Sequence, residues 1–432
     1  MRILLIVVYY PPDTTSAAQM MRDLALEFVR QGHQVMVVTP SDSAKCATYV
    51  TDEDGVIVVR VKAGNTKSAN KVLRLWRESR LSATIWRSAR GVFRENPCEL
   101  VVFYSPPIFF GDLVSRLKAL WGCRSYLVHR DIFPQWAVDA GVLREGGMLH
   151  RYLRRKEVAQ YVAADIIGVE APGNLPYFNH ESQGNNYSAE VLYNWISTRA
   201  ELTCTSGWRQ RLGLEGKVVF FYGGNIGVAQ DMDNIIRLAA SLRARDDLFF
   251  LLMGAGSEVQ RLNLEIDRRG LSNIRIHPAI PEKEYMQCLC EFDVGLVSLD
   301  RRLRSNNFTG KVLGYVSCGK PILASVNAGN GLIDLLRRAD AGIACTNGED
   351  DSFRSAALVL ATQPLIRQRM GRNARALCDT TFSVQAIAKQ ILSHFGSAID
   401  EAKSVTQQPL KGGNVSVRPN PLRDALRQSD EF

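Results

Sequence analysis

The stretch KVVFFYGGN (Lys217–Asn225) is an uninterrupted apolar run that ends abruptly in two glycines and an asparagine. Strands with one face in water alternate apolar and polar residues, whereas strands covered on both faces read as continuous apolar runs. This stretch is therefore predicted to be an inner strand of a parallel sheet. The pattern recurs downstream, with helical stretches between the runs, in LFFLLMGAG, IRIHPAI, DVGLVSLD, KPILASV and AGIACTN.

A first series of such repeats precedes this one. It begins with the apolar run RILLIVVYY (Arg2–Tyr10) and the amphipathic stretch AAQMMRDLALEFVRQG (Ala17–Gly32). The 432 residues exceed what one hydrophobic core usually organises. Two consecutive series predict an α/β protein with two doubly wound, Rossmann-like domains that face each other across a cleft. We place these domains at residues 1–198 and 199–382, a helix crossing back to the first domain at 383–399, and a disordered, Gln- and Pro-rich tail at 400–432.

The composition is that of a globular protein, with 22% charged and 46% apolar residues. No stretch approaches the roughly 20 apolar residues that a membrane-spanning helix needs. The first apolar run stops at Pro11-Pro12 without a small-residue cleavage site, which favours a buried strand over a signal peptide. Nine scattered cysteines favour reduced thiols in a cytoplasm, and no Cys/His spacing predicts a metal site.

Nearly all of the net charge of +9 comes from one segment, residues 62–94, which has nine Lys/Arg and one acid. The residues that suggest a membrane contact are the arginines and tryptophans Arg74, Trp76, Arg77, Arg80, Trp86 and Arg87. Basic side chains with tryptophans beside an apolar helix stripe suit an anionic membrane surface. A basic face would also suit nucleic acid, and a solvated helix packed on the domain explains the same pattern.

Ligands of open parallel sheets bind beyond the carboxyl ends of the strands, so the residues there are candidates. Ser16 follows the first strand at the start of a helix, where amide groups suit a phosphate. Glycines follow two later strands, in Gly223–Gly227 and Gly254–Gly256. His129, Arg130 and Asp131 end the run RSYLVHRD, and Glu170 ends DIIGVE. The turns at Ser16, Gly223–Gly227 and Gly254–Gly256 together favour an anionic nucleotide ligand, although neither a G-x-G-x-x-G opening nor a P-loop is present.

Six stretches in order resemble a known family, the glycosyltransferases of family 4 (glycosyl transferases group 1), which have the GT-B fold. They are YYPPD with the helix after it, RDIFPQWAVDAGVL, VLYNWIS, FFYGGNIGVAQDMDNII, LLMGAGSE and KVLGYVSCGKPILASV, within residues 1–395. Within the family the chain is similar to bacterial O-antigen and capsule enzymes such as the L-fucosamine transferases. The resemblance implies an acceptor in the N-terminal domain, a nucleotide-sugar donor in the C-terminal domain, and no cofactor, because the nucleotide-sugar is a substrate.

The resemblance also assigns roles to the strand-end residues. Asp131 would hold a sugar hydroxyl or accept the acceptor's proton, Arg130 would offset charge on the leaving diphosphate, and His129 would lie close by. An Arg130–Asp131 ion pair that only ties loops together is the plain alternative. Lys311, with Arg304 beside it, would face the donor phosphates. The remaining nucleotide-sugar candidates are Gly224, Asn225, Gly227, Gly254, Gly256, Ser16 and, more weakly, Glu170.

Three positions depart from the family pattern. Asn225 and Gln230 stand where an arginine and a lysine are common, which shifts phosphate binding onto Lys311. Gly314 and Asn306 stand where two glutamates are usual, and Gly314 cannot hold a ribose. Ser16-Ala17 replaces a glycine pair after the first strand, which narrows the room for a phosphate.

The resemblance and the basic segment together predict a retaining, metal-independent glycosyltransferase. It would move a sugar from a UDP-linked donor to a lipid-diphosphate-linked saccharide during O-antigen or capsule synthesis. We expect it in the cytoplasm, attached peripherally to the anionic inner face of the cell membrane, with no nucleic-acid partner. Two alternatives stay open: a nucleotide-sugar 2-epimerase, and a non-catalytic partner that binds nucleotide-sugar or lipid in a polysaccharide assembly complex.

Overall fold

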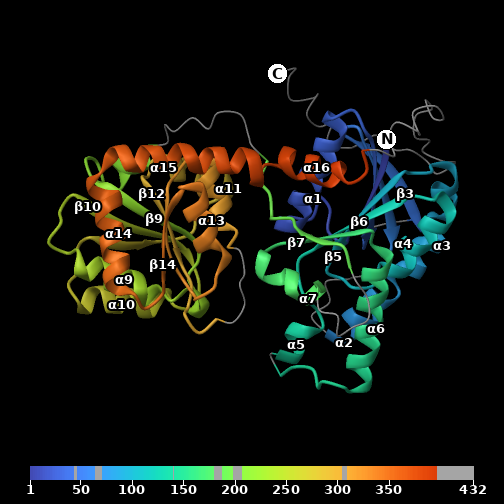
Figure 1. The fold of residues 1–432 in the computed structure, drawn as a ribbon, viewed down its shortest axis with the longest axis horizontal. Coiled ribbons are helices and arrows are strands. Elements are labelled where there is room, and N and C mark those ends of the chain that lie inside the picture. The colour runs from blue at the N-terminus through green and yellow to red at the C-terminus, as the bar shows by residue number, and fades with distance from the viewer. Residues whose placement is uncertain are drawn as a thin grey trace. The chain divides into compact units, whose positions relative to one another are not determined.

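The protein is represented by a computed structural model that describes residues 1–42, 46–63, 71–139, 141–179, 187–197, 207–303 and 309–396. The chain divides into two compact units. The N-terminal unit comprises residues 1–170 and 174–192 together with the chain from residue 387, and the C-terminal unit comprises residues 171–173 and 193–386. Figure 1 shows a sheet covered by helices in each unit.

The N-terminal unit contains an eight-stranded sheet in the order β3-β4-β2-β1-β5-β6-β7-β8. All neighbours are parallel except β3, which pairs antiparallel with β4 at the edge. Its strands are β1 (Arg2–Ile6), β2 (Gln34–Ser41), β3 (Thr48–Glu53), β4 (Val56–Lys62), β5 (Leu100–Ser105), β6 (Arg124–His129), β7 (Ile166–Val169) and β8 (Ala189–Val191). Its helices are α1 (Ser16–Arg30), α2 (Lys71–Ser79), α3 (Leu81–Glu95), α4 (Gly111–Trp121), α5 (Gln135–Asp139), α6 (Met148–Ala163) and α7 (Leu175–Asn179).

The C-terminal unit contains a six-stranded parallel sheet in the order β11-β10-β9-β12-β13-β14. Its strands are β9 (Val218–Asn225), β10 (Leu248–Ala255), β11 (Ile274–His277), β12 (Val294–Ser298), β13 (Ile322–Val326) and β14 (Gly342–Thr346). Its helices are α8 (Trp208–Arg211), α9 (Met232–Ser241), α10 (Val259–Arg268), α11 (Glu282–Cys290), α12 (Lys311–Ser317), α13 (Gly331–Ala339), α14 (Asp350–Thr362) and α15 (Pro364–Leu377). The last described helix, α16 (Val384–Ser393), begins in this unit and continues into the N-terminal unit.

Both sheets have the strand order of a doubly wound dinucleotide-type fold, in which the chain reverses direction beside its first strand. In the C-terminal unit the reversal lies between β9 and β12. Phe221 of β9 packs into the core on one face of the sheet, and Phe220 packs into the core on the other. Burial on both faces explains why the strand sequences are continuous apolar runs, and it confirms the predicted α/β class.

Candidate functional site

The carboxyl ends of β9 and β10 approach each other so closely that only glycine fits. The strands pair in parallel with Gly254 opposite Gly224. A Cβ atom on Gly254 would lie 1.8 Å from the Gly224 carbonyl oxygen, and one on Gly256 would lie 2.1 Å from the oxygen of Ile226. Gly224 also has a positive φ of 123°. Gly224 and Gly256 are exposed and leave bare backbone at the carboxyl ends of β9 and β10, and β9 borders the reversal point of the sheet, where such folds bind ligands.

Lys311 begins α12 next to this backbone. Its Cε lies 3.7 Å from the position of a Cβ on Gly224, and its ammonium nitrogen lies 4.7 Å from the centre of the Tyr222 ring. Among the described residues, Lys311 has no hydrogen-bond or ion-pair partner. Desolvation lowers the pKa of Lys311 to about 8. A half-buried cation without a carboxylate beside it is suited to an anionic ligand.

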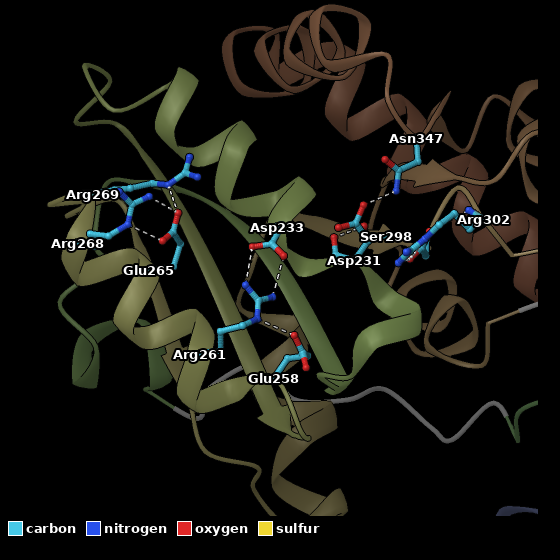
Figure 2. Close-up of polar contacts among 11 residues, drawn as sticks. Asp231, Asp233, Glu258, Arg261, Glu265, Arg268, Arg269, Ser298, Arg302 and Asn347 are labelled. Carbon is cyan, nitrogen blue, oxygen red and sulfur yellow. Dashed lines mark hydrogen bonds and ion pairs between the residues drawn. The ribbon is translucent and has the colours of Figure 1, made fainter.

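A polar network supports the loop after β9. The Gln230 side-chain oxygen accepts hydrogen bonds from the Asn225 amide at 3.0 Å and from the Gly227 backbone at 3.1 Å. Figure 2 shows the next layer, in which Asn347 donates to the Asp231 carboxylate at 2.9 Å and Ser298 donates to the Asp231 carbonyl at 3.1 Å. Asn225 and Gln230, predicted to leave phosphate binding to Lys311, are therefore partners that shape this loop.

In the N-terminal unit, Arg130, Asp131 and Glu170 come together where β6 and β7 end. The strands pair with His129 opposite Val169, which places Arg130 beside Glu170. Arg130 is buried and donates to the carbonyl oxygens of His129 at 3.1 Å and Leu192 at 2.9 Å. Asp131 is exposed, although nearby protein atoms desolvate its carboxyl group enough to raise its pKa against the lowering effect of Arg130. Asp131 is thus accessible to a substrate, whereas Arg130 is held by the backbone.

His129 lies beneath this edge rather than at it. Its side chain is 1% exposed, and its Nε2 lies 3.0 Å from the hydroxyl of Tyr161. Burial and the charge of Arg130 lower the pKa of His129 to about 3, so the ring is neutral at pH 7. This position argues against direct contact between His129 and a substrate.

The hydroxyl of Tyr161 also contacts the buried carboxylate of Glu157, which was not among the candidates predicted from the sequence. It donates to Glu157 at 2.8 Å, and Tyr177 donates to the same oxygen at 2.9 Å. Arg154 forms an ion pair with Glu157. The network ties α6 and α7 to the end of β6. The only sequence signal for it was the four-residue spacing of Glu157 and Tyr161 on one helix face.

Four other positions singled out in the sequence differ in what the structure adds. Ser16 is exposed at the first position of α1, in the N-terminal unit, after the cap residue Thr15. Arg304 and Asn306 lie outside the described residues. Gly314 is buried in α12, and a Cβ there would lie 3.3 Å from Leu289 and 3.9 Å from Tyr285. A side chain at 314 would therefore point at the core, which gives a packing reason for glycine at this position.

The basic segment separates into two parts with different surroundings. The apolar stripe of α3 packs into the core, and Trp86 is half-buried there, stacked on Phe93 with ring centres 6.4 Å apart. Part of the Trp86 ring therefore packs within the unit, while Arg87 on the same helix is exposed, and contact of either residue with a membrane stays a prediction. On α2, Trp76 is 54% exposed, Arg80 stacks on its ring, and Arg74 pairs with Glu78 at 2.8 Å. Arg77 of α2 is partly buried.

Comparisons with known proteins identify the C-terminal half. Residues 206–377 match the family model "Glycosyl transferases group 1". The chain is 25% identical over 232 residues to a Pseudomonas aeruginosa protein described as "Probable glycosyltransferase WbjE", a match covering 53% of this chain and 58% of that protein. The chain thus spans under two thirds of that curated relative. Residues 206–377 thus carry a glycosyl transferases group 1 domain, as predicted for the C-terminal half of the chain.

Solved structures with this fold have low sequence identity. Sucrose-phosphate synthase from Thermosynechococcus elongatus is 15% identical, with a TM-score of 0.65, over 93% of this chain and all of that one. HepE from Anabaena, solved in complex with UDP, is 17% identical, with a TM-score of 0.61, over 92% of this chain and all of that one. WaaG, a glycosyltransferase involved in lipopolysaccharide biosynthesis, is 16% identical, with a TM-score of 0.57, over 91% and 99%. These likenesses confirm the GT-B class of the two-sheet fold.

Proposed function

We propose that the chain transfers a sugar from a UDP-linked donor to a saccharide carried on a lipid diphosphate. The observation that carries the proposal is the surroundings of Lys311: a half-buried lysine without a carboxylate partner among the described residues, beside glycines that expose backbone. A departing nucleotide diphosphate carries negative charge, so it would supply the anionic partner that Lys311 lacks among the described residues. The group 1 domain in residues 206–377 supports the donor class, as does the UDP in the HepE structure.

In this proposal the donor belongs to the C-terminal unit and the acceptor to the N-terminal unit. The bond between the sugar and the diphosphate breaks, UDP leaves with both bonding electrons, and an acceptor hydroxyl takes the sugar. Asp131, exposed at the end of β6 with a raised pKa, is the group that accepts the hydroxyl proton or holds a sugar hydroxyl. The positive charge of Arg130 lies close to the Asp131 carboxylate and offsets its negative charge. Retention of configuration rests on the family resemblance alone.

The proposal extends to a lipid-linked acceptor, a role in O-antigen or capsule synthesis and a location at the inner membrane face. They rest on the basic residues of α2 and on the similarity to WaaG and WbjE, whose descriptions name lipopolysaccharide biosynthesis and glycosyl transfer respectively. No helix in the described part of the chain is both long and apolar enough to cross a bilayer.

One incubation tests the proposal. The chain is mixed with a panel of UDP-sugars, with and without lipid-linked saccharides extracted from membranes, and products are read by mass. A glycosyltransferase releases UDP and adds one sugar mass only when acceptor is present. Conversion of the UDP-sugar to an isomer without acceptor would identify an epimerase. A chain that binds UDP-sugar but yields no product, and whose binding is unaffected by Asp131→Ala, would be the non-catalytic partner.

A further inference from the structure

Exposed apolar side chains concentrate in one part of the N-terminal unit. The described residues include eleven large hydrophobic side chains with substantial exposure, and six of them lie on α2, on α5, between α5 and α6, and in the first turns of α6. They are Trp76 at 54%, Trp136 at 52%, Val142 at 69%, Met148 at 87%, Leu149 at 49% and Tyr152 at 40%. Scattered exposed apolar residues are ordinary, whereas a concentration of them marks an interaction surface.

These three elements meet around a small separate core. Leu75 of α2, Phe133 before α5, Leu143 and Leu153 of α6 pack together with Ile108 and Phe109. Figure 1 shows α2, α5 and the start of α6 gathered at the lower end of the N-terminal unit. Trp76 directly follows Leu75, Val142 directly precedes Leu143 and Tyr152 directly precedes Leu153, so exposed side chains stand next to core members along the chain. We call the six exposed residues, with the arginines described next, the α2–α6 surface.

The surface is basic as well as apolar. Residues 74–80 and 135–155 contain seven arginines and three carboxylates, and two of the arginines, Arg74 and Arg154, are paired with Glu78 and Glu157. Arg80, Arg144 and Arg155 are exposed and have no ion-pair partner within the described residues. Arg80 lies 4.6 Å above the Trp76 ring. Met148 and Tyr152 of α6 are four residues apart and therefore share a face of the helix. Arg144 precedes α6 in the sequence, and Arg155 follows Tyr152 on the helix.

We propose that the α2–α6 surface binds the headgroup layer of an anionic lipid bilayer. Tryptophan and tyrosine favour the boundary between headgroups and acyl chains, and arginines attract lipid phosphates. The charge decides against a second copy of the chain as occupant, because two such basic surfaces repel each other. The inference rests on the proposed lipid-linked acceptor, but it assigns the contact to α2, α5 and α6 rather than to α3, whose apolar face is buried.

Vesicle binding by the full chain tests the proposal. The protein is sedimented with phosphatidylcholine vesicles that contain or lack phosphatidylglycerol. We expect binding that requires phosphatidylglycerol and weakens with salt, because screening acts on exposed charges. Each arginine near such a surface contributes about 1 kcal/mol, so loss of three positive charges lowers the partition coefficient about a hundredfold, and the charge reversals Arg80→Glu, Arg144→Glu and Arg155→Glu together should lower it by more than that. Trp76→Ser, Trp136→Ser and Met148→Ser together should lower it at any salt concentration.

A matched control carries the same charge change elsewhere. Arg243, Arg354 and Arg372 are exposed in the C-terminal unit, and their replacement by glutamate should leave vesicle binding within about twofold of the unmodified chain. Equal loss in this control, or no binding of the unmodified chain to anionic vesicles, would overturn the proposal. The proposal would also be overturned if the unmodified chain did not bind vesicles but formed a dimer, and the Trp76, Trp136 and Met148 variant dissociated that dimer.

The same variants separate this proposal from the proposed function. Their affinity for UDP should be unchanged, because UDP is assigned to the C-terminal unit. Vesicle binding by a chain that transfers no sugar would refute the proposed function and leave the α2–α6 surface standing. Sugar transfer by a chain that does not bind anionic vesicles would support the proposed function and refute membrane binding by the α2–α6 surface.

Discussion

Replacing Lys311 by methionine is expected to stabilise the fold while removing UDP binding. In the folded chain the pKa of Lys311 is about 8, against 10.5 for an ordinary lysine. The unfolded chain therefore binds this proton more tightly, and the charged form destabilises the fold fully below pH 8 and progressively less up to pH 10.5. Each pH unit of the difference is worth about 1.4 kcal/mol, so Lys311→Met should raise the free energy of unfolding at pH 7 by up to about 3 kcal/mol.

The assay is urea unfolding at pH 7 and pH 10, with calorimetric titration of UDP at each pH. The stability advantage of Lys311→Met should shrink toward pH 10. UDP affinity of the unmodified chain should fall above pH 8, because binding requires the charged lysine. Lys320→Met is the control: Lys320 donates to the Cys290 carbonyl at 2.6 Å, so its loss should cost about 1 kcal/mol and leave UDP affinity intact. A Lys311→Met chain that is less stable than the unmodified one, or that binds UDP equally well, refutes the reasoning.

Three further predictions concern the strand ends. Gly254→Ala places a Cβ 1.8 Å from the Gly224 carbonyl, so it should lower the free energy of unfolding by about 1–3 kcal/mol in urea titrations and weaken UDP binding; full UDP affinity would contradict the role of the glycines. Acidification from pH 6.5 toward 3 should destabilise the chain, because unfolded His129 takes up a proton that the folded site refuses; His129→Gln should flatten this pH dependence in unfolding experiments, and an unchanged slope would count against it. Asp131→Asn should cut the rate of sugar transfer by about 10²- to 10⁴-fold while changing stability by less than about 0.5 kcal/mol, and a normal rate would exclude Asp131 from the chemistry.

The fold followed from the sequence because its signal is local. Runs such as VVFFY are apolar at every position, and burial on both faces of a strand is the ordinary way to satisfy them. The glycines after β9 and β10 were likewise readable, because sharp strand-end turns favour glycine. The antiparallel edge strand β3 was not predicted. Its sequence TYVTDE is short, contains polar residues and ends in two acids, a composition that loops also have.

The site was less predictable because its decisive features join residues far apart in sequence. The burial of His129 depends on Tyr161, which is 32 residues away. Trp76 and Trp86 have similar basic neighbours, yet only the core that α3 covers determines which ring is exposed. The lack of a carboxylate beside Lys311 among the described residues depends on how the whole unit folds, so no local pattern predicts it. The roles of Asp131, Arg130 and Lys311 in catalysis and donor binding stay predictions.

The central claim is that the C-terminal unit holds a nucleotide diphosphate at Lys311. A crystal structure of the full chain grown with UDP tests it most directly. The diphosphate should lie within about 4 Å of the Lys311 ammonium, with the nucleoside against the exposed backbone of Gly224 and Gly256. UDP bound away from the carboxyl ends of β9 and β12, or a Lys311 ammonium that contacts no phosphate oxygen, would contradict it.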